Sequence, residues 1–398
     1  MLYIIGGKVM TMAGSVWKKG YICIDNGKIM DLGPMHEGAP FPLPKDAQVI
    51  SALGALVMPG LIEAHCHMGI TEEKKGMEGD DCNETVDPIT PQLRSIDAIN
   101  PMDAAFDDAL RAGITSAMIG PGSANVVGGT FSFIKTCGRT IDDMVVLAPA
   151  AMKIAFGENP KVNYSGQGKS PSTRMAIAAM LREELFKARQ YYHKKRAGMN
   201  PEDEDFRYEC WLPVFEKNIP LKAHVHRADD IQTAIRIAKE FDLDMTLDHC
   251  SEGHLIKEQV REAGYPCIIG PDLASRSKIE VQNMAFKTVG ILNAEGVKTA
   301  ITTDHPVSLI QSLPICAGLA MKSGMKEEEA LLAITRYPAE ICRVFDRVGS
   351  LEPGKDADIA IFTDSPLKIE TKALCTIIEG KIVYADESFG SISSGIML

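Results

Sequence analysis

The sequence predicts an α/β protein in which a (β/α)8 TIM barrel carries a small β-sandwich formed by the N- and C-terminal segments. Three observations predict this fold. Short apolar runs alternate with helical patterns through the middle of the chain, as they do in parallel α/β proteins. Strands with tight hairpin turns occur near both ends. Side chains that bind metals follow several of the middle runs, and active sites of barrels lie at the carboxyl ends of the strands.

The two ends of the chain share a strand-and-turn pattern that predicts the sandwich. Near the N-terminus, Asn26-Gly27 separates two apolar runs, which is a strong hairpin signal. Near the C-terminus, Glu379-Gly380 occupies the same kind of position. Two half-sheets on either side of a different middle suggest that both ends meet in one small domain. The predicted ranges are 1–54 and 351–398 for the two sandwich halves and 55–350 for the barrel.

Eight short apolar runs in the middle of the chain are candidate barrel strands. Longer helical patterns separate most of them, so eight such units fit a (β/α)8 barrel. The expected strands are 57–65, 115–119, 131–136, 152–156, 221–226, 245–249, 267–269 and 300–304.

The composition describes an acidic globular protein and excludes several classes of partner. The chain has 398 residues, 45% of them hydrophobic, which is enough to bury a large core. Its net charge is −11, without a Lys and Arg cluster interleaved with aromatics, so we expect neither nucleic acid nor a membrane surface as partner. No secretory signal and no long apolar run is visible. Ten scattered cysteines without a Cys-x-x-Cys pair fit reduced thiols, so we expect a cytoplasmic protein.

Two histidines early in the barrel region form half of a candidate metal site. His65 and His67 are separated by one residue, so on an extended strand both side chains point to the same side. In isolation, such a pair is more often a chance occurrence or a local hydrogen-bonding feature. Later apolar runs change this interpretation because they end in further metal-binding residues, His224, His249 and Asp304. Imidazole and carboxylate are the nitrogen and oxygen ligands expected for Zn²⁺ and related ions.

The order of these motifs resembles the metal-dependent amidohydrolase superfamily, and within it the imidazolonepropionase-like branch. The resemblance covers nearly the whole chain: His-x-His follows Pro59-Gly60-Leu61-Ile62, single histidines follow two later strands, and Thr303-Asp304-His305-Pro306 follows the last strand. It implies a hydrolase with one or two divalent metal ions, and Zn²⁺ is the ion we expect. After the first motif the chain departs from authentic imidazolonepropionase, reading His65-Cys66-His67-Met68-Gly69-Ile70. The reaction of that enzyme is therefore not implied.

The resemblance also implies a set of metal ligands. A carboxylate group after the fourth strand often bridges two ions in this superfamily, and Glu158 is our expected bridge, with a carbamylated Lys153 as the alternative. With a bridge, one ion would be bound by His65, His67 and Asp304 and the other by His224 and His249. Without a bridge, a single ion would be bound by His65, His67, His224 and Asp304, with His249 hydrogen-bonding water or substrate. We expect the arrangement with two ions.

Asp304 is the predicted general base. A divalent cation lowers the pKa of bound water towards about 7, and a neighbouring carboxylate can take and relay the proton. Three residues are predicted to contact substrate. His226 shares a strand face with His224, Asn125 lies in a glycine-rich loop after the second strand, and Arg227 could hold an acidic group.

The predicted function is hydrolysis of a non-peptide carbon–nitrogen bond in a small molecule, such as a cyclic amide, an N-acyl amino acid or a dipeptide-like amide. The first alternative is hydrolytic deamination of a heterocycle. It is disfavoured because the segment after the fifth strand reads Arg227-Ala228-Asp229-Asp230, where deaminases of the superfamily often carry a helper glutamate. The second alternative, a non-catalytic scaffold, is disfavoured because every expected ligand type is present. The resemblance to this superfamily also implies a possible homo-oligomer.

Overall fold

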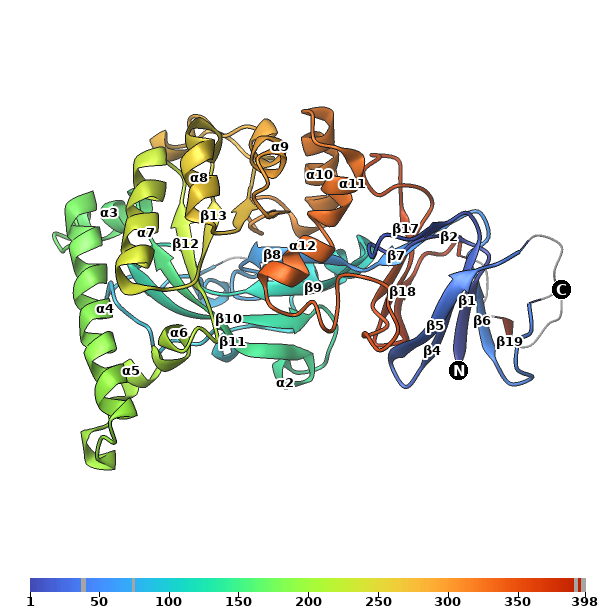
Figure 1. Cartoon of the computed structure of the whole chain (residues 1–398), viewed down its shortest axis with the longest axis horizontal. Coiled ribbons are helices and arrows are strands. Elements are labelled where there is room, and N and C mark those ends of the chain that lie inside the picture. The colour runs from blue at the N-terminus through green and yellow to red at the C-terminus, as the bar shows by residue number, and fades with distance from the viewer. Residues whose placement is uncertain (37–40, 74–75, 390–392, 395–398) are drawn as a thin grey trace.

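Three sheets organise the computed structural model, which describes residues 1–36, 41–73, 76–389 and 393–394. An eight-stranded sheet forms the barrel, and two smaller sheets form the sandwich at one end of the molecule (Figure 1). The predicted fold class, a TIM barrel with a small β-sandwich, is confirmed. None of the described helices is both long enough and apolar enough to span a membrane.

Each of the eight expected barrel strands has a counterpart in the sheet. Most of their side chains are buried, as expected for strands covered on both faces. In sheet order the strands are β8 (Leu61–Cys66), β9 (Ile114–Ile119), β10 (Val127–Lys135), β11 (Val145–Ala155), β12 (Leu221–Val225), β13 (Met245–His249), β14 (Cys267–Ile269) and β15 (Thr299–Ile301).

Side chains join the two edge strands of this sheet and close the barrel. The buried Glu63 carboxylate, on β8, accepts hydrogen bonds from the hydroxyl of Thr302 at 2.5 Å and from the amide of Thr303 at 2.9 Å. Both threonines directly follow β15. Through these hydrogen bonds, Glu63 fixes the end of the last strand against the first.

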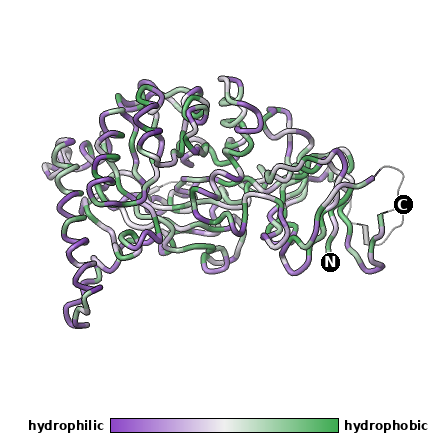
Figure 2. Tube along the Cα trace, in the orientation of Figure 1, coloured by the Kyte–Doolittle hydropathy of each residue, from purple (hydrophilic) through white to green (hydrophobic). Residues whose placement is uncertain are grey.

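Helices cover the outside of the barrel and bury one face each. In α7, residues Ile231, Ile235 and Ala238 are buried at helical spacing. The helix α4 is the longest, runs along one side of the barrel and projects beyond it (Figure 1), and its projecting end is mainly hydrophilic (Figure 2). The helices are α1 (Ala104–Arg111), α2 (Ile141–Met144), α3 (Glu158–Ser165), α4 (Arg174–Arg196), α5 (Phe206–Glu209), α6 (Leu212–Phe215), α7 (Ala228–Phe241), α8 (Lys257–Ala263), α9 (Lys287–Ala294), α10 (Leu313–Lys322), α11 (Glu327–Leu332) and α12 (Arg336–Ile341).

One barrel strand departs from the expected parallel arrangement. Strand β10 is antiparallel to both β9 and β11. Parallel neighbours need a crossover of about a dozen residues or more, whereas the connections on either side of β10 are only 120–126 and 136–144. The second connection holds just the short helix α2. The expectation of a parallel sheet is therefore wrong for this strand.

The two ends of the chain pair with each other in the sandwich. Strand β16 (Ile359–Phe362) is antiparallel to β7 (Leu56–Pro59). The expected barrel strand 57–65 is therefore two strands, and β7 belongs to the sandwich sheet. The break falls at Gly60, where a Cβ atom would lie 2.2 Å from the Thr115 side chain, so a larger residue does not fit. The other sandwich strands are β1 (Leu2–Ile5), β2 (Lys8–Met10), β3 (Val16–Trp17), β4 (Gly20–Asp25), β5 (Lys28–Pro34), β6 (Gln48–Ser51), β17 (Ala373–Ile378), β18 (Lys381–Ala385) and β19 (Ser393–Ser394).

Both predicted hairpin turns are present. Asn26 and Gly27 join β4 to β5 with φ of 48° and 78°, and Glu379 and Gly380 join β17 to β18 with φ of 47° and 72°. Two successive positive φ angles match the right-handed twist of the flanking strands. The apolar faces of the two sandwich sheets form one core.

A buried ion cluster fastens the barrel to the sandwich. Nζ of Lys135, at the end of β10, lies 2.8 Å from Asp356 and 2.6 Å from Asp358, just before β16. All three side chains are at most 4% exposed. Lys28 and Arg347 also bind Asp356. Because the charges are paired, the desolvation cost of burying them is offset.

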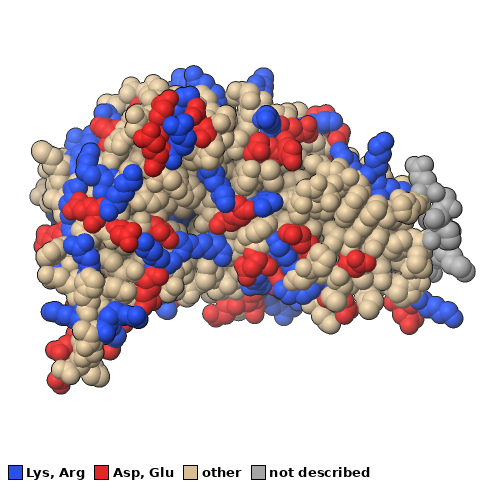
Figure 3. All heavy atoms as spheres, in the orientation of Figure 1, with Lys and Arg blue, Asp and Glu red and all other residues tan. Residues whose placement is uncertain are grey.

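The charges on the molecular surface are mixed in sign. On the face shown in Figure 3, Lys and Arg alternate with Asp and Glu. The net charge of −11 is therefore not concentrated in one acidic patch on this face.

Candidate metal centre

The first group of candidate ligands lies where β8 and β15 end. His65, His67 and Asp304 are buried or nearly so, and their ligand atoms all lie within 4.8 Å of one another. Oδ1 of Asp304 is 3.2 Å from Nε2 of His67 and 3.6 Å from Nε2 of His65. Tetrahedral Zn²⁺ with bonds of about 2.1 Å separates its ligand atoms by about 3.4 Å. The observed spacing therefore fits three ligands of one ion.

The second group comprises His224, His226 and His249, from the ends of β12 and β13. Their ligand atoms also lie within 4.8 Å of one another, and all three rings are buried. The His224 ring centroid is 4.5 Å from that of His249. The two groups adjoin, because the His65 and His249 centroids are 5.0 Å apart. His226, which we expected to contact substrate, thus lies among the candidate ligands.

Neighbouring groups fix the orientation of several of these rings. Three of the rings, those of His65, His67 and His249, each donate one N–H to an acceptor, as is usual for metal-bound histidine. Nδ1 of His65 donates to the Asp248 carboxylate at 2.6 Å. Nδ1 of His67 donates to the Gly120 carbonyl at 2.7 Å, and Nδ1 of His249 donates to the Gly270 carbonyl at 2.7 Å.

Burial keeps most of these histidines neutral. Desolvation lowers the pKa of His224 and holds the pKa values of His65, His226 and His249 well below the usual range. A neutral imidazole has the lone pair that a metal requires. These four rings are therefore ready to bind an ion at neutral pH.

His67 differs from the other rings in its charge. Burial lowers its pKa, but the neighbouring Cys82 and Asp304 outweigh burial and raise the pKa to about 10. Without a metal the ring is therefore protonated and paired with Asp304. Metal binding at this position requires His67 to lose that proton.

The backbone is strained at two of the candidate ligands. His249 and Asp304 have φ of 69° and 53°, in the left-handed region that residues other than glycine rarely adopt. Such strain is typical of functional sites, where the surrounding structure imposes it. At Gly270, a Cβ atom would lie 2.2 Å from the Thr302 carbonyl oxygen, so the strand ends approach closely here.

Lys153 is the residue of the fourth strand that reaches the site. Its side chain is fully buried in β11, and Nζ lies 3.2 Å from Nε2 of His65. Burial lowers its pKa to about 8. A lysine with a lowered pKa is more often the free amine and hence nucleophilic. Lys153 therefore lies beside the first group of candidate ligands.

Glu158, the expected bridge, belongs to neither group of ligand residues in the described part of the chain. Its amide donates to Oε2 of Glu280 at 2.8 Å, and its Oε2 accepts from the Glu280 amide at 3.3 Å. Strand β11 ends at Ala155, and the chain turns at Gly157, with φ of 82°, before α3 begins at Glu158. This turn places Glu158 at the start of α3, against the connection after β14.

Two expected substrate residues are engaged elsewhere. The Asn125 amide donates to the Asp87 carbonyl and the Thr90 hydroxyl, so it braces the loops around β10. Arg227 forms a two-pronged ion pair with Asp229 at 2.9 Å on each arm. The structure therefore brings neither Asn125 nor Arg227 into the cluster of candidate ligands.

Sequence reasoning gave no role to two buried carboxylates near the site. Asp248 orients His65 and also pairs with Lys222 at 3.0 Å. Glu280, in the connection after β14, faces His224. Asp248 is a charged residue inside the apolar run 245–249, and this unusual position could have indicated a role in the site. No periodic pattern surrounds Glu280, so the sequence carries no comparable signal for it.

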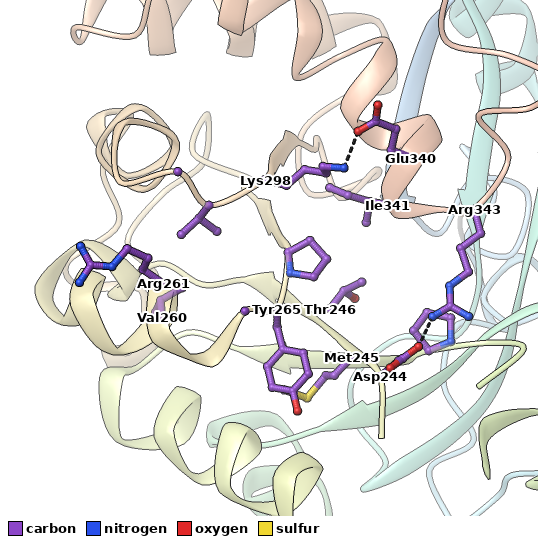
Figure 4. Close-up of a pocket in the computed structure, with 15 residues that line it drawn as sticks. Asp244, Met245, Thr246, Val260, Arg261, Tyr265, Lys298, Glu340, Ile341 and Arg343 are labelled. Carbon is purple, nitrogen blue, oxygen red and sulfur yellow. Dashed lines mark hydrogen bonds and ion pairs between the residues drawn. The ribbon is translucent and has the colours of Figure 1, made fainter. Parts of the chain in front are cut away.

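A surface pocket lies at the opposite end of the barrel. It is lined by Asp244 and Met245, at the start of the strand that ends with His249, and by Lys298, before β15 (Figure 4). Four of its charged side chains form two ion pairs, Lys298 with Glu340 and Arg343 with Asp244. This pocket is therefore separate from the candidate metal centre.

Comparison with known proteins identifies the family. The profile of the Amidohydrolase family matches residues 56–383. An amidohydrolase from Thermotoga maritima MSB8 is 36% identical, with a TM-score of 0.92 over 97% of this chain and 100% of that chain. The chain therefore belongs to the amidohydrolase family, as its motifs predicted. That family consists of hydrolases, which is the predicted class of enzyme.

Two curated relatives are more distant. Amidohydrolase tasK of Hapsidospora irregularis is 27% identical over 94% of this chain, which spans only 41% of that relative. The imidazolonepropionase of Brevibacillus brevis (strain 47 / JCM 6285 / NBRC 100599) is 25% identical over 90% of this chain and 87% of the relative. The resemblance to the imidazolonepropionase branch is thus confirmed.

The residues of the site fit a divalent metal ion, which members of this family generally bind. Imidazole nitrogens and a carboxylate are suitable ligands for first-row ions. In the described structure, Nδ1 of His224 is buried without a hydrogen-bond partner. A buried polar atom without a partner is costly unless something else satisfies it. A cation would do so.

Proposed function

We propose that the protein is a metal-dependent amidohydrolase that cleaves a non-peptide carbon–nitrogen bond in a small molecule. The substrate is a cyclic amide, an N-acyl amino acid or a dipeptide-like amide. The observation that carries this proposal is the pair of adjoining ligand groups at the carboxyl ends of the barrel strands, His65, His67 and Asp304 beside His224, His226 and His249. Active sites of this fold lie at that end.

The two adjoining groups of candidate ligands are enough to bind two ions. His65, His67 and Asp304 would hold one ion, and His224 and His249 would hold the other, with His226 close to it. A carbamate on Lys153 would present two oxygens beside His65 and replace Glu158 as the bridge. We propose Zn²⁺ because neutral imidazoles and carboxylates are its usual ligands outside cysteine sites.

Different residues of the chain have different roles in the proposed reaction. A bound divalent cation lowers the pKa of water and polarises a carbonyl oxygen. Asp304 accepts the proton released as water attacks the carbonyl carbon, and then transfers it to the leaving nitrogen. The hydrogen bond from His65 to Asp248 holds the ring in place during these steps. Burial of the site keeps other water away from the reacting atoms.

A substrate screen tests the proposal. Metal-loaded protein is incubated with cyclic amides, N-acyl amino acids and dipeptides, and ring opening or amine release is measured. Asp304→Asn, which cannot accept the proton, is the blank, and we expect its kcat to fall about 10²–10⁴-fold. Turnover by this variant at the parent rate contradicts the role of Asp304. Release of ammonia from a heterocycle, without ring opening, would instead support a deaminase.

A further inference from the structure

A buried carboxylate connects the strand of His65 to the segment that carries Asp304. Glu63 precedes His65 by two residues on β8, and its side chain is 0% exposed. Its Oε1 accepts from the His65 amide at 3.1 Å and from the Thr302 hydroxyl at 2.5 Å. Its Oε2 accepts from the amide and the hydroxyl of Thr303, at 2.9 and 2.7 Å. Both oxygens are thus engaged within the chain, and in the described residues Glu63 belongs to neither group of candidate ligands.

The hydroxyl of Thr302 extends this connection to Asp304. Its oxygen accepts from the Asp304 amide at 3.1 Å. Two acceptors lie within reach of its proton, Oε1 of Glu63 at 2.5 Å and the His65 carbonyl at 2.6 Å. A hydroxyl donates one hydrogen bond and can accept others. Thr302 therefore connects the Asp304 backbone to β8, whichever of the two oxygens receives the proton.

The backbone of Asp304 is strained, and hydrogen bonds hold it on both sides. Its φ of 53° lies in the left-handed region. The Thr302 hydroxyl accepts from its amide, and its carbonyl accepts from the Val307 amide at 2.9 Å. In this conformation Oδ1 of Asp304 lies 3.2 Å from Nε2 of His67 and 3.6 Å from Nε2 of His65. Relaxation of φ would move the carboxylate relative to both rings.

We propose that Glu63 and Thr302 are positioning residues, which hold Asp304 in the strained conformation that directs its carboxylate at the site. This inference rests on the proposed function, because it assumes that Asp304 takes part in the reaction. A misplacement of about 1 Å in a reacting group can reduce a rate by about 10²-fold. If Glu63 served only to close the barrel, the loss of any one of its hydroxyl donors would have the same consequence.

Two substitutions of similar shape separate positioning from barrel closure. Thr302→Val and Thr303→Val each remove one hydroxyl that donates to Glu63. Only Thr302→Val also removes the oxygen that accepts from the Asp304 amide. We expect Thr302→Val to lower kcat about 10–100-fold, and Thr303→Val to react at close to the parent rate. Thr302→Ser, which keeps the hydroxyl, should restore most of the activity.

Crystal structures of the metal-free variants give a second measurement that needs no substrate. In Thr302→Val we expect the φ of Asp304 to leave the left-handed region, and the separation of its Oδ1 from Nε2 of His67 to increase from 3.2 Å. Thr303→Val and Thr302→Ser should retain both values. Thermal melting shows whether each variant folds. If Thr302→Val does not fold, Thr302→Ala and Thr303→Ala provide the same comparison.

The outcomes separate this inference from the proposed function. Parent activity in Thr302→Val, or a loss of activity with Asp304 in its parent position, overturns the positioning role. Equal losses in Thr302→Val and Thr303→Val also overturn it, because they assign Glu63 to barrel closure alone. A parent that hydrolyses none of the amides contradicts the proposed function. The structures of the metal-free variants still decide whether Thr302 positions Asp304.

Discussion

Nζ of Lys153 lies 3.2 Å from Nε2 of His65 in the buried interior of the barrel. An unmodified lysine is a poor neighbour for a metal ligand because its ammonium group repels a cation. Reaction of the free amine with carbon dioxide would replace that positive charge with a carbamate, which has two oxygens and a negative charge. The proposed carbamylated side chain would account for the position of Lys153 beside His65.

Removing Lys153 should cost the protein a metal ion. We expect Lys153→Ala to bind the ions about 10–100-fold more weakly and to lose hydrolytic activity, because the bridging oxygens are gone. Added acetate or propionate, which fits the vacated space and supplies a carboxylate, should restore part of both. Metal counting with and without the added acid checks this. Unchanged metal content in Lys153→Ala contradicts the bridging role.

Reconstitution with metal should depend on bicarbonate and pH. Burial lowers the pKa of Lys153 to about 8, so the fraction of neutral amine rises as the pH increases through this value. Only the neutral amine reacts with carbon dioxide. With the concentration of dissolved carbon dioxide held constant, we expect recovery of activity to be faster one pH unit above this pKa than one unit below it. A rate that does not respond to bicarbonate would count against carbamylation.

Asp248 should control metal affinity without touching the metal. Its carboxylate accepts from Nδ1 of His65 at 2.6 Å. We expect Asp248→Asn to weaken metal binding about 10–100-fold, because an amide orients and polarises the ring less well. Competition with a chelator measures the change. Asp244→Asn, just before the same strand but 42% exposed at the far end of the barrel, is the matched control and should bind metal like the parent.

Lys135 should be important for stability but not for metal binding. We expect Lys135→Met to lower the free energy of unfolding by about 3–5 kcal/mol, because it leaves the buried carboxylate of Asp358 without its cation. Lys28→Met removes a partner of Asp356 that is 46% exposed, so it should cost only about 0–1 kcal/mol. Denaturant unfolding of both variants checks the difference. Equal, small decreases in the free energy of unfolding for both variants would contradict this prediction, because they would mean that water already stabilises the carboxylates of the cluster.

Much of the fold and part of the site could be predicted because they follow local patterns. Apolar runs marked all eight barrel strands, and the ligand residues His65, His224 and Asp304 stand at or near strand ends, where barrel geometry gathers side chains. The antiparallel course of β10 was missed because strand direction depends on the length of the connections. The sequence pattern of a buried strand is the same in either direction.

The remaining parts of the site depend on contacts between segments distant in sequence. Lys153 and Glu158 are five positions apart, but Lys153 reaches His65 from β11, whereas Glu158 follows the turn at Gly157 and lies at the start of α3. Glu280 meets His224 through an irregular connection whose path no periodicity reveals. Asn125 was expected near substrate, but its amide is used to brace loops. Residue type alone does not distinguish these uses.

Anomalous X-ray diffraction from crystals of the zinc-loaded protein, recorded at the zinc absorption edge, tests the central claim most directly. The account predicts one strong peak enclosed by His65, His67 and Asp304, and a second peak beside His224 and His249. Zinc-loaded crystals with no anomalous peak at these side chains would contradict it.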